Sequence, residues 1–449
     1  MEFLMPPIEQ TGGGYSPAAV KAQPERSCPA PQAPPGAAGL GNNAINVHRD
    51  TRAPITAKLI ESPSQAKRAT LWRIKEAGWD FLPERAQKCM RVRIQGAVEV
   101  ATYQNDKGGT RACYRGLVTC ANLNACPICA HRIKTVRALE LGEQLDAWAD
   151  HHGGKNAVSL LTLTIRHHQG HRLAPMVKKL QKAQRALWNR LNRQTKRLGG
   201  KSQCEAWGLV GTVRALETTS GQNGWHPHAH TLICWESPKK KAELAEVEKL
   251  VSSVWRECVR KYVGAEHEPD MAHGVDLRGG ASAGAYLLKL AFEASDPVAK
   301  VGREINGEKG RSPFQLLDDA GKVDGDGDPL DEKAGQLFLE FVAAMKGARL
   351  FEYSRRGDFK RNLRRLAKQD EEKTDEELAG DRGSAVLSLT AETWARVAGK
   401  RGARAKLLSM VEHAGAAGGV RWLKDEGLFA KSAEQERAEH EELWKMVTG

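Results

Sequence analysis

Residues 208–235 read GLVGTVRALETTSGQNGWHPHAHTLICW. The two outer parts, residues 208–218 and 228–235, are rich in the apolar and β-branched side chains that favour strands. Between them, residues 219–224 contain Ser, Asn and two Gly, which is typical of a turn. The stretch therefore predicts a β-hairpin, and we expect the rest of the core to be built around it.

Segments on both sides of the hairpin alternate between strand-like and helical patterns. Residues 157–165 and 274–278 resemble strands, whereas residues 173–198 and 242–263 have apolar side chains at helical spacing. This order predicts an α+β fold with a central, mainly antiparallel sheet and flanking helices. Other expected elements are a strand at 91–100, helices at 66–78, 133–149, 281–294, 335–345 and 359–368, and a loop at 302–335.

Composition divides the chain into four expected regions. Residues 1–60 are rich in Pro, Gly and Ala and are predicted to form a disordered tail. Residues 61–150 form an N-terminal region with a cysteine cluster, and residues 151–300 form the core around the hairpin. Residues 301–449 are expected to form a loop followed by a basic, helical C-terminal region.

The charge of the chain favours a polyanionic partner. Among 449 residues, 68 are Lys or Arg and 55 are Asp or Glu, which gives a formal charge of +13. Nucleic acid is the leading candidate, and a basic protein without such a partner is the alternative. No apolar run approaches the roughly 20 residues that span a bilayer, and the first residues do not resemble a secretory signal. We therefore expect a cytoplasmic protein without a membrane partner.

Three histidines lie at the start of the second strand of the hairpin or just before it. Residues two apart on a strand point to the same face, so His228 and His230 project together, with His226 just before them. Two imidazoles on one face are half of a divalent metal site. The alternative is a group of ordinary surface histidines, but three of the chain's 14 histidines within five residues favour the metal site.

The first strand of the hairpin offers a third ligand. If Glu217 pairs with His228, then Ala215 lies opposite His230, and the carboxylate shares a face with both imidazoles. A register shifted by one residue would turn Glu217 to the other face. The alternative to metal ligation is an ion pair of Glu217 with Arg214 or another basic residue at the surface. Two histidines and a carboxylate suit Mn²⁺ or Mg²⁺ bound partly by substrate oxygens, and such an ion can polarise a phosphodiester.

A nucleophile for such a phosphodiester is present further along the chain. Tyr286 and Lys289 are three residues apart and share a face of the predicted helix at 281–294. An ammonium group beside a phenol favours the phenolate and can hold a phosphate oxygen. The alternative is a core tyrosine with a lysine whose charged end reaches solvent.

Four cysteines in the N-terminal region have spacings that suit zinc. They are Cys113, Cys120, Cys126 and Cys129. The last two form a Cys-x2-Cys knuckle, and four thiolates complete a tetrahedral structural site. His131 is an alternative to Cys113, and four buried reduced thiols are the alternative to any metal. Five scattered cysteines are expected to be inert, namely Cys28, Cys89, Cys204, Cys234 and Cys258.

Basic side chains are dense on the helix predicted at 173–198. This face can follow the phosphates of DNA, although a merely solvated helix face is the alternative. The candidate DNA contacts are Lys178, Lys182, Arg185, Arg193 and Arg197. An acidic stretch at Asp324–Asp328 resembles a calcium loop but has Gly335 where the loop needs Glu, so we expect a surface turn.

Taken in order, these segments resemble the rolling-circle replication initiators of small bacterial plasmids, which belong to the HUH endonucleases. Residues 160–164 (LLTLT) resemble the first motif of that family. Residues 214–218 (RALET) followed by 226–230 (HPHAH) resemble the second motif, and the segment with Tyr286 and Lys289 resembles the third. Two later segments are also similar, at residues 311–317 (RSPFQLL) and 348–355 (ARLFEYSR).

The resemblance implies site-specific nicking and joining of DNA at a plasmid origin. His228 and His230 would hold Mn²⁺ or Mg²⁺ with Glu217, and His226 would add a contact or shape the turn. Tyr286 would attack the phosphodiester, become joined to the 5′ phosphate and release a 3′ hydroxyl that primes synthesis. The Cys-Pro-x-Cys segment is common in these initiators and favours zinc. Ser282 stands where some relatives have a glutamate that ends replication.

The same resemblance implies partners and leaves two alternatives open. Expected partners are single-stranded or hairpin DNA at the nick site, the adjacent duplex, and a host helicase and DNA polymerase in the bacterial cytoplasm. A single-tyrosine transposase or relaxase would use the same chemistry on other DNA. A zinc-dependent nucleic-acid-binding regulator would use the histidines only structurally. The zinc segment and the Ser-Pro-Phe element at residues 312–314 favour plasmid replication.

Overall fold

The computed structural model of this chain describes most of the region after residue 61. The described residues are 62–94, 96–105, 108–271, 273–280, 304–305, 308–354, 358–369 and 371–430. Tyr286, Lys289 and the helix predicted at 281–294 lie outside the described residues. The tail predicted at residues 1–60 also lies outside them, so these expectations stay predictions.

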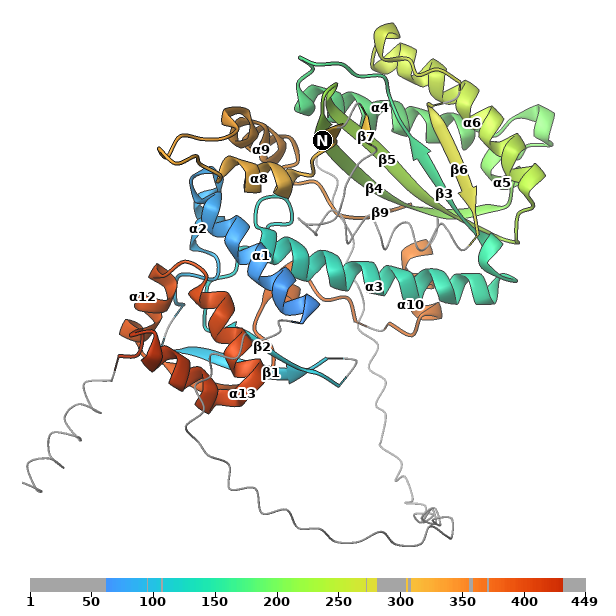
Figure 1. The fold of residues 1–449 in the computed structure, drawn as a ribbon. Coiled ribbons are helices and arrows are strands. Elements are labelled where there is room, and N and C mark those ends of the chain that lie inside the picture. Colours follow the sequence, from blue (N-terminus) through green and yellow to red (C-terminus); the bar gives the residue numbers. More distant parts are fainter. Residues whose placement is uncertain are drawn as a thin grey trace, which may run out of the picture. The chain divides into compact units, whose positions relative to one another are not determined.

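A five-stranded antiparallel sheet forms the centre of the structure (Figure 1). The predicted hairpin supplies its longest strands, and all neighbouring strands run antiparallel. The predicted α+β class is therefore confirmed. In spatial order the strands are β6 (Val275–Gly279), β3 (Val158–Leu163), β5 (Gly224–Trp235), β4 (Leu209–Gly221) and β9 (Glu352–Tyr353).

The hairpin turns tightly at its tip. Gly221 pairs with Gly224, which leaves Gln222 and Asn223 as the loop. Gly224 has a φ of +79°, a conformation that favours glycine. A Cβ at this position would also lie 3.1 Å from the carbonyl oxygen of His168, so a larger residue is disfavoured on two counts.

Helices cover both faces of the sheet, because the strands place apolar side chains on each face in alternation. Leu161, Ile233 and Trp235 pack in one core with the apolar sides of α4 (Leu173–Leu191) and α6 (Lys241–Tyr262). The opposite face packs on α3 (Pro127–His151) and α10 (Phe359–Leu366) through Leu160, Val213 and Leu232. Figure 1 shows α3 running along one side of the sheet, with α4 and α6 on the other.

A second antiparallel sheet joins segments from both ends of the described chain. Its order is β10 (Ser384–Leu389), β1 (Val98–Gln104) and β2 (Thr110–Arg115). The phenol of Tyr114 donates a 2.8 Å hydrogen bond to the carbonyl oxygen of Arg404. This sheet is packed by α1 (Pro63–Ala77), α12 (Ala391–Gly399) and α13 (Ala403–Asp425).

The segment predicted as a loop at 302–335 contains a helix, which corrects that prediction. Helix α8 spans Pro313–Ala320 and begins with a capping box, in which Ser312 and Gln315 each accept the other's backbone N–H. Later in the segment, the carboxylate of Asp324 accepts hydrogen bonds from the backbone N–H groups of Asp326 and Asp328. These acidic residues are exposed and form the surface turn that the sequence predicts.

The remaining elements are short, apart from α9. Among the described helices, none is long and apolar enough to cross a membrane. The predicted strand at 91–100 begins later, at Val98, and is β1. The other elements are α2 (Glu84–Lys88), α5 (Gln203–Ala206), β7 (Glu304–Ile305), β8 (Glu308–Lys309), α9 (Glu332–Ala344) and α11 (Asp375–Ala379).

Candidate functional site

The hairpin register brings the predicted carboxylate and imidazoles to one face. Glu217 pairs with His228, and Ala215 pairs with His230, as the sequence predicts. Ala229 turns to the opposite face and is buried in the core formed with α4 and α6. Glu217, His228 and His230 therefore share the face of the sheet that α3 covers further along.

His230 is held from both ring nitrogens. Its side chain is 1% exposed, and its Nδ1 lies 3.1 Å from the hydroxyl of Thr162 on β3. Its Nε2 lies 2.9 Å from Oε2 of Glu217. When Nδ1 carries the ring hydrogen, the Nε2 lone pair faces the carboxylate, and a proton or a cation between them is required to avoid repulsion.

Four histidines form a row that leads to Glu217. The ring centroids of His167 and His226 are 4.2 Å apart, those of His226 and His228 are 3.8 Å apart, and those of His228 and His230 are 5.7 Å apart. Burial lowers the pKa of His226 to about 2 and that of His228 to about 4. Repulsion from neighbouring histidines adds to the effect, so these rings are neutral at pH 7 and retain lone pairs for a metal.

Two of the three predicted ligands lie at a spacing that suits a divalent cation. Nδ1 of His228 is buried and has no hydrogen-bond partner in the part of the chain that the structure describes. The 2.9 Å between His230 Nε2 and Glu217 Oε2 matches the spacing of about 3 Å between adjacent ligands in an octahedron with bonds of about 2.1 Å. However, only the cysteine cluster brings three or more ligand atoms within 4.8 Å of one another among the described residues.

The histidines open into a surface hollow of about 660 Å³. Thr162 and the three histidines of β5 line it, and β6 contributes Asp276 and Arg278 from the other edge of β3. Asp276 pairs with Thr162 and forms a 2.8 Å ion pair with Arg278. The hollow therefore combines imidazoles with side chains of both signs of charge.

A buried lysine approaches Glu217 from α3. Lys134 is 7% exposed, and it lines a small cavity together with Glu217. Burial lowers the pKa of Lys134 to about 8, although the negative charge of Glu217 acts in the opposite direction. Lys134 could not be predicted from sequence, because only the packing of α3 against the hairpin brings it to Glu217.

A buried cluster of four cysteines can hold a metal such as zinc. It consists of Cys89, Cys120, Cys126 and Cys129. The Sγ–Sγ distances are 3.4 Å for Cys89–Cys129, 3.7 Å for Cys120–Cys129 and 3.8 Å for Cys126–Cys89. A zinc tetrahedron with Zn–S bonds of about 2.3 Å has sulfur–sulfur edges of about 3.8 Å. The spacing is therefore close to that of a structural zinc site.

Two details of the predicted cysteine site are wrong. Cys113 is not in the cluster, because its place on β2 directs its Sγ to the carbonyl oxygen of Arg382, 3.2 Å away. Cys89 takes its position, although the sequence analysis assigned Cys89 to the inert group. His131, the predicted alternative to Cys113, lines a different cavity. Cys89 lies far from the knuckle in sequence, and no pattern in its local sequence links it to the cluster.

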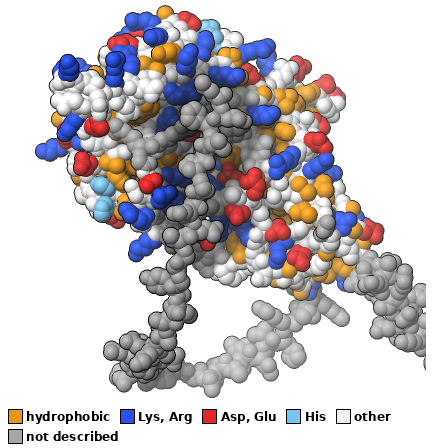
Figure 2. All heavy atoms as spheres, turned by 180° about the vertical axis from the view of Figure 1, so that it is seen from behind, with side chains coloured by type: hydrophobic (Ala, Val, Ile, Leu, Met, Phe, Trp, Pro, Cys, Tyr) orange, Lys and Arg blue, Asp and Glu red, His pale blue; other side chains and the backbone are white. Residues whose placement is uncertain are grey.

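The predicted DNA-binding side chains lie on the other side of the sheet from the histidines. Lys178, Lys182 and Arg185 are exposed on α4, and Arg193 and Arg197 are exposed after its end. Helix α4 packs on the strand face opposite to His230, where Gln184 bonds Thr231 at 3.3 Å. On the face seen in Figure 2, basic side chains are numerous but stand among acidic ones. DNA contact by these five residues stays a prediction.

Two more residues of the site were missed. Thr162, which orients His230, lies within the LLTLT segment, but the sequence analysis assigned it no role. His167 follows β3 and contacts His226. Its signal is the pair His167-His168 shortly after a strand, which becomes informative only when β3 is known to lie beside β5.

Comparison with known proteins shows that this chain is similar to replication proteins. Residues 115–269 match a protein family described as "Replication protein". A curated relative, "Protein rep" from Streptomyces lividans, is 28% identical over 295 residues, which cover 54% of this chain and 63% of the relative. No solved structure matches this chain significantly.

The family match covers only some of the candidate site residues. The family match includes the cysteine cluster from Cys120 onward and the whole histidine hairpin. It ends before Tyr286 and Lys289. The chain spans less than two thirds of the length of the curated relative that it matches.

Proposed function

We propose that this chain initiates rolling-circle replication of a bacterial plasmid by nicking and rejoining one DNA strand at the origin. The observation that carries the proposal is the hairpin face, where His228 and His230 stand beside Glu217 in a segment similar to replication proteins. A cytoplasmic location and the use of a host helicase and polymerase belong to the same proposal.

In the proposed reaction, Tyr286 is the nucleophile. Its phenolic oxygen loses its proton and forms a bond to the phosphorus of the scissile phosphodiester. The bond between phosphorus and the 3′ oxygen breaks, and the 3′ oxygen takes up a proton and leaves as a hydroxyl. The product is a 5′ phosphotyrosine ester, which retains the bond energy, so a 3′ hydroxyl can reverse the step. Lys289 would favour the phenolate and hold a phosphate oxygen.

His228, His230 and Glu217 would hold Mn²⁺ or Mg²⁺ in this proposal, and His226 would support His228 through ring contact. The cation, when bound, supplies Lewis-acid stabilisation of charge on the scissile phosphate. Thr162 fixes the ring orientation of His230 through the 3.1 Å contact with Nδ1. The low pKa of His228 keeps its lone pair available across the physiological range.

The zinc ion that we propose for the cysteine cluster has a structural role. Cys126 is the N-cap of α3, and Cys129 lies in the first turn of this helix. The cluster would therefore fix the start of the helix that carries Lys134 to Glu217. We assign it no part in the chemistry.

The test is a nicking assay with the full chain, Mn²⁺ and a supercoiled plasmid that carries the replicon encoding this chain. The proposal expects relaxed plasmid and protein attached to a 5′ end, with mass spectrometry placing the attachment at Tyr286. Tyr286→Phe should abolish both, whereas Tyr262→Phe, at the end of α6, should keep both. No relaxation by the parent chain would favour a binding regulator. Equal nicking by Tyr286→Phe would place the nucleophile elsewhere.

A further inference from the structure

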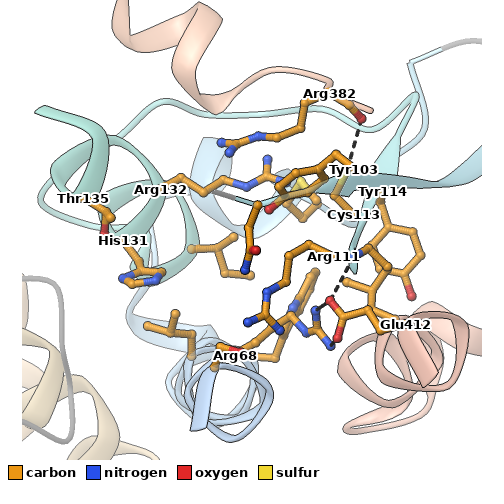
Figure 3. A pocket seen from close by; sticks show the side chains of 18 of the residues that line it. Arg68, Tyr103, Arg111, Cys113, Tyr114, His131, Arg132, Thr135, Arg382 and Glu412 are labelled. Atoms are coloured by element: carbon orange, nitrogen blue, oxygen red, sulfur yellow. Dashed lines mark hydrogen bonds and ion pairs between the residues drawn. The ribbon is translucent and has the colours of Figure 1, made fainter. Parts of the chain in front are cut away.

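A second cavity lies away from the histidine face, beside the three-stranded sheet (Figure 3). Its volume is about 290 Å³, and its lining comes from α1, β1, β2, α3, α13 and the segment before β10. This volume is near the lower end of the range of about 300–1,000 Å³ that small-molecule sites occupy. The proposed nicking chemistry does not use this cavity.

Four arginines line the cavity, against a single carboxylate among the described residues that line it. They are Arg68, Arg111, Arg132 and Arg382, and the carboxylate is that of Glu412. In Figure 3 the guanidinium groups of Arg132 and Arg382 lie on one side of the cavity, across from those of Arg68 and Arg111. Such an excess of cationic groups around one cavity favours the binding of an anion.

Glu412 cannot supply that anion, because its oxygens are already used. Glu412 is 3% exposed and accepts hydrogen bonds of 2.6 and 3.0 Å from Arg68. It also accepts a 2.9 Å bond from Gln65 and a 2.8 Å bond from the backbone N–H of Ala112. Arg68 and Glu412 therefore neutralise each other, and the charges of the other three arginines remain uncompensated within the lining.

Neutral groups hold two of these three arginines. Arg132 donates a 2.9 Å hydrogen bond to the carbonyl oxygen of Ala379, and Arg382 donates a 3.0 Å bond to that of Leu378. Carbonyl oxygens position the guanidinium groups without removing their charge. Burial, together with repulsion from Arg132, lowers the pKa of Arg382. A bound anion between the two arginines would relieve this repulsion.

Arg111 is the third, and its side chain makes no hydrogen bond or ion pair with any residue that the structure describes. The hydroxyl of Thr135, which also lines the cavity, is buried and has no partner among the described residues. The guanidinium group of Arg111 and the hydroxyl of Thr135 are therefore both available to bind a ligand. A guanidinium group can donate two parallel hydrogen bonds to phosphate oxygens. A phosphate monoester carries about −1.5 to −2 charges at pH 7.

The rest of the lining suits the remainder of a nucleotide. Leu71, Ile128, Val136 and Leu408 give an apolar wall, and Tyr103 offers a ring near the guanidinium of Arg382, 5.8 Å from its centroid. Bases stack on aromatic rings and guanidinium planes irrespective of sequence. We propose that this cavity binds a nucleotide unit, held through its phosphate by Arg111, Arg132 and Arg382. The source is either a free nucleotide or one nucleotide of a single strand.

The test measures binding to the full chain by calorimetry, with deoxyadenosine 5′-monophosphate, deoxyadenosine and a single-stranded 12-mer as probes. Arg111→Gln is the main variant, since it removes a side chain with no described partner. Arg361→Gln is the control, because the side chain of Arg361 is 81% exposed and, within the described part of the chain, forms an ion pair only with Asp358. If Arg111→Gln lowers the melting temperature of the free chain, Arg111→Lys and Thr135→Val replace it.

Two results support the proposal and identify the source. If the monophosphate binds, deoxyadenosine does not, and Arg111→Gln weakens binding about tenfold or more, a free nucleotide is the ligand. If only the 12-mer loses affinity in Arg111→Gln, with its salt slope reduced by about one, the nucleotide belongs to a strand. Equal binding of both probes to the parent, Arg111→Gln and Arg361→Gln would overturn the proposal. The binding measurements do not involve nicking. They should therefore give the same result in a chain that carries Tyr286→Phe, whether or not the proposed nicking reaction is correct.

Discussion

The orientation of the His230 ring is fixed by its neighbours in the sheet. Thr162 fixes one ring nitrogen, and Glu217 lies 2.9 Å from the other, on adjacent strands of one sheet. Strand periodicity leaves Glu217 two possible faces, and the observed register places it opposite His228, which is one of the two cases that the sequence left open. The sequence does not predict Thr162, since the order of β3 and β5 in the sheet is not written in local periodicity.

At this scale, Glu217→Gln should weaken Mn²⁺ binding about tenfold or more, because an amide oxygen is a poorer ligand than a carboxylate. Titration of the metal-free chain with Mn²⁺, followed by electron paramagnetic resonance, measures the change. Asp276→Asn is the matched control, as it removes a carboxylate from the same hollow. An equal loss in both variants would mean that the overall charge of the hollow, rather than ligation by Glu217, binds the ion.

Protonation of His228 should make the metal-free protein less stable in acid. Its pKa is about 4 in the folded chain and about 6.5 when unfolded. Below pH 6.5 the unfolded state therefore binds more protons, and stability falls as the pH drops from 6.5 toward 4. Between pH 7.5 and pH 5 this group should cost about 2 kcal/mol. Urea unfolding of the parent and of His228→Gln at both pH values measures it. A difference between the two chains that does not depend on pH would contradict the assignment.

At the scale of elements, helix α3 connects the two candidate metal sites. Its N-cap and first turn belong to the cysteine cluster, Lys134 reaches Glu217, and Trp148 near its end packs under the sheet. Helical periodicity predicts most of this helix. The fourth cysteine could not be predicted, because Cys89 comes from a separate segment that only tertiary packing brings to the cluster.

Cys89→Ser should therefore remove bound zinc, while Cys113→Ser should retain it. Loss of one thiolate from a four-thiolate site abolishes the closed tetrahedron, whereas Cys113 only contacts a backbone carbonyl. Elemental analysis of the purified chains gives the zinc content per molecule. If Cys89→Ser keeps its zinc and Cys113→Ser loses it, Cys113 is the fourth ligand, as the spacing in the sequence suggested.

At the scale of the whole molecule, the C-terminal part of the described chain completes the N-terminal sheet. β10 pairs with β1, and Glu412 and Arg404 from α13 contact Arg68 and Tyr114. Local patterns could predict helices within residues 301–449, but they could not place one of the strands of this region in a sheet with residues 98–115. Pairings of such long sequence separation leave no local signal.

A chain that ends at Arg382 should lose the ordered structure of β1 and β2 but keep the histidine hairpin. The truncation removes β10, α12 and α13, which exposes the apolar side chains of β1. Hydrogen exchange should show lost protection at residues 98–115 and retained protection at residues 209–235. A chain ending at Ala430 is the control and should resemble the parent. Loss of protection over the hairpin as well would show that the two sheets unfold together.

In the proposed function, the two faces of the central sheet constrain the path of DNA. The basic side of α4 and the histidines point in opposite directions, with a layer of strands between them. A duplex resists bending over so short a length, since its persistence length is about 150 base pairs. DNA that meets both surfaces must therefore arrive as two separate stretches, or reach the histidines as a melted strand led around the rim of the sheet.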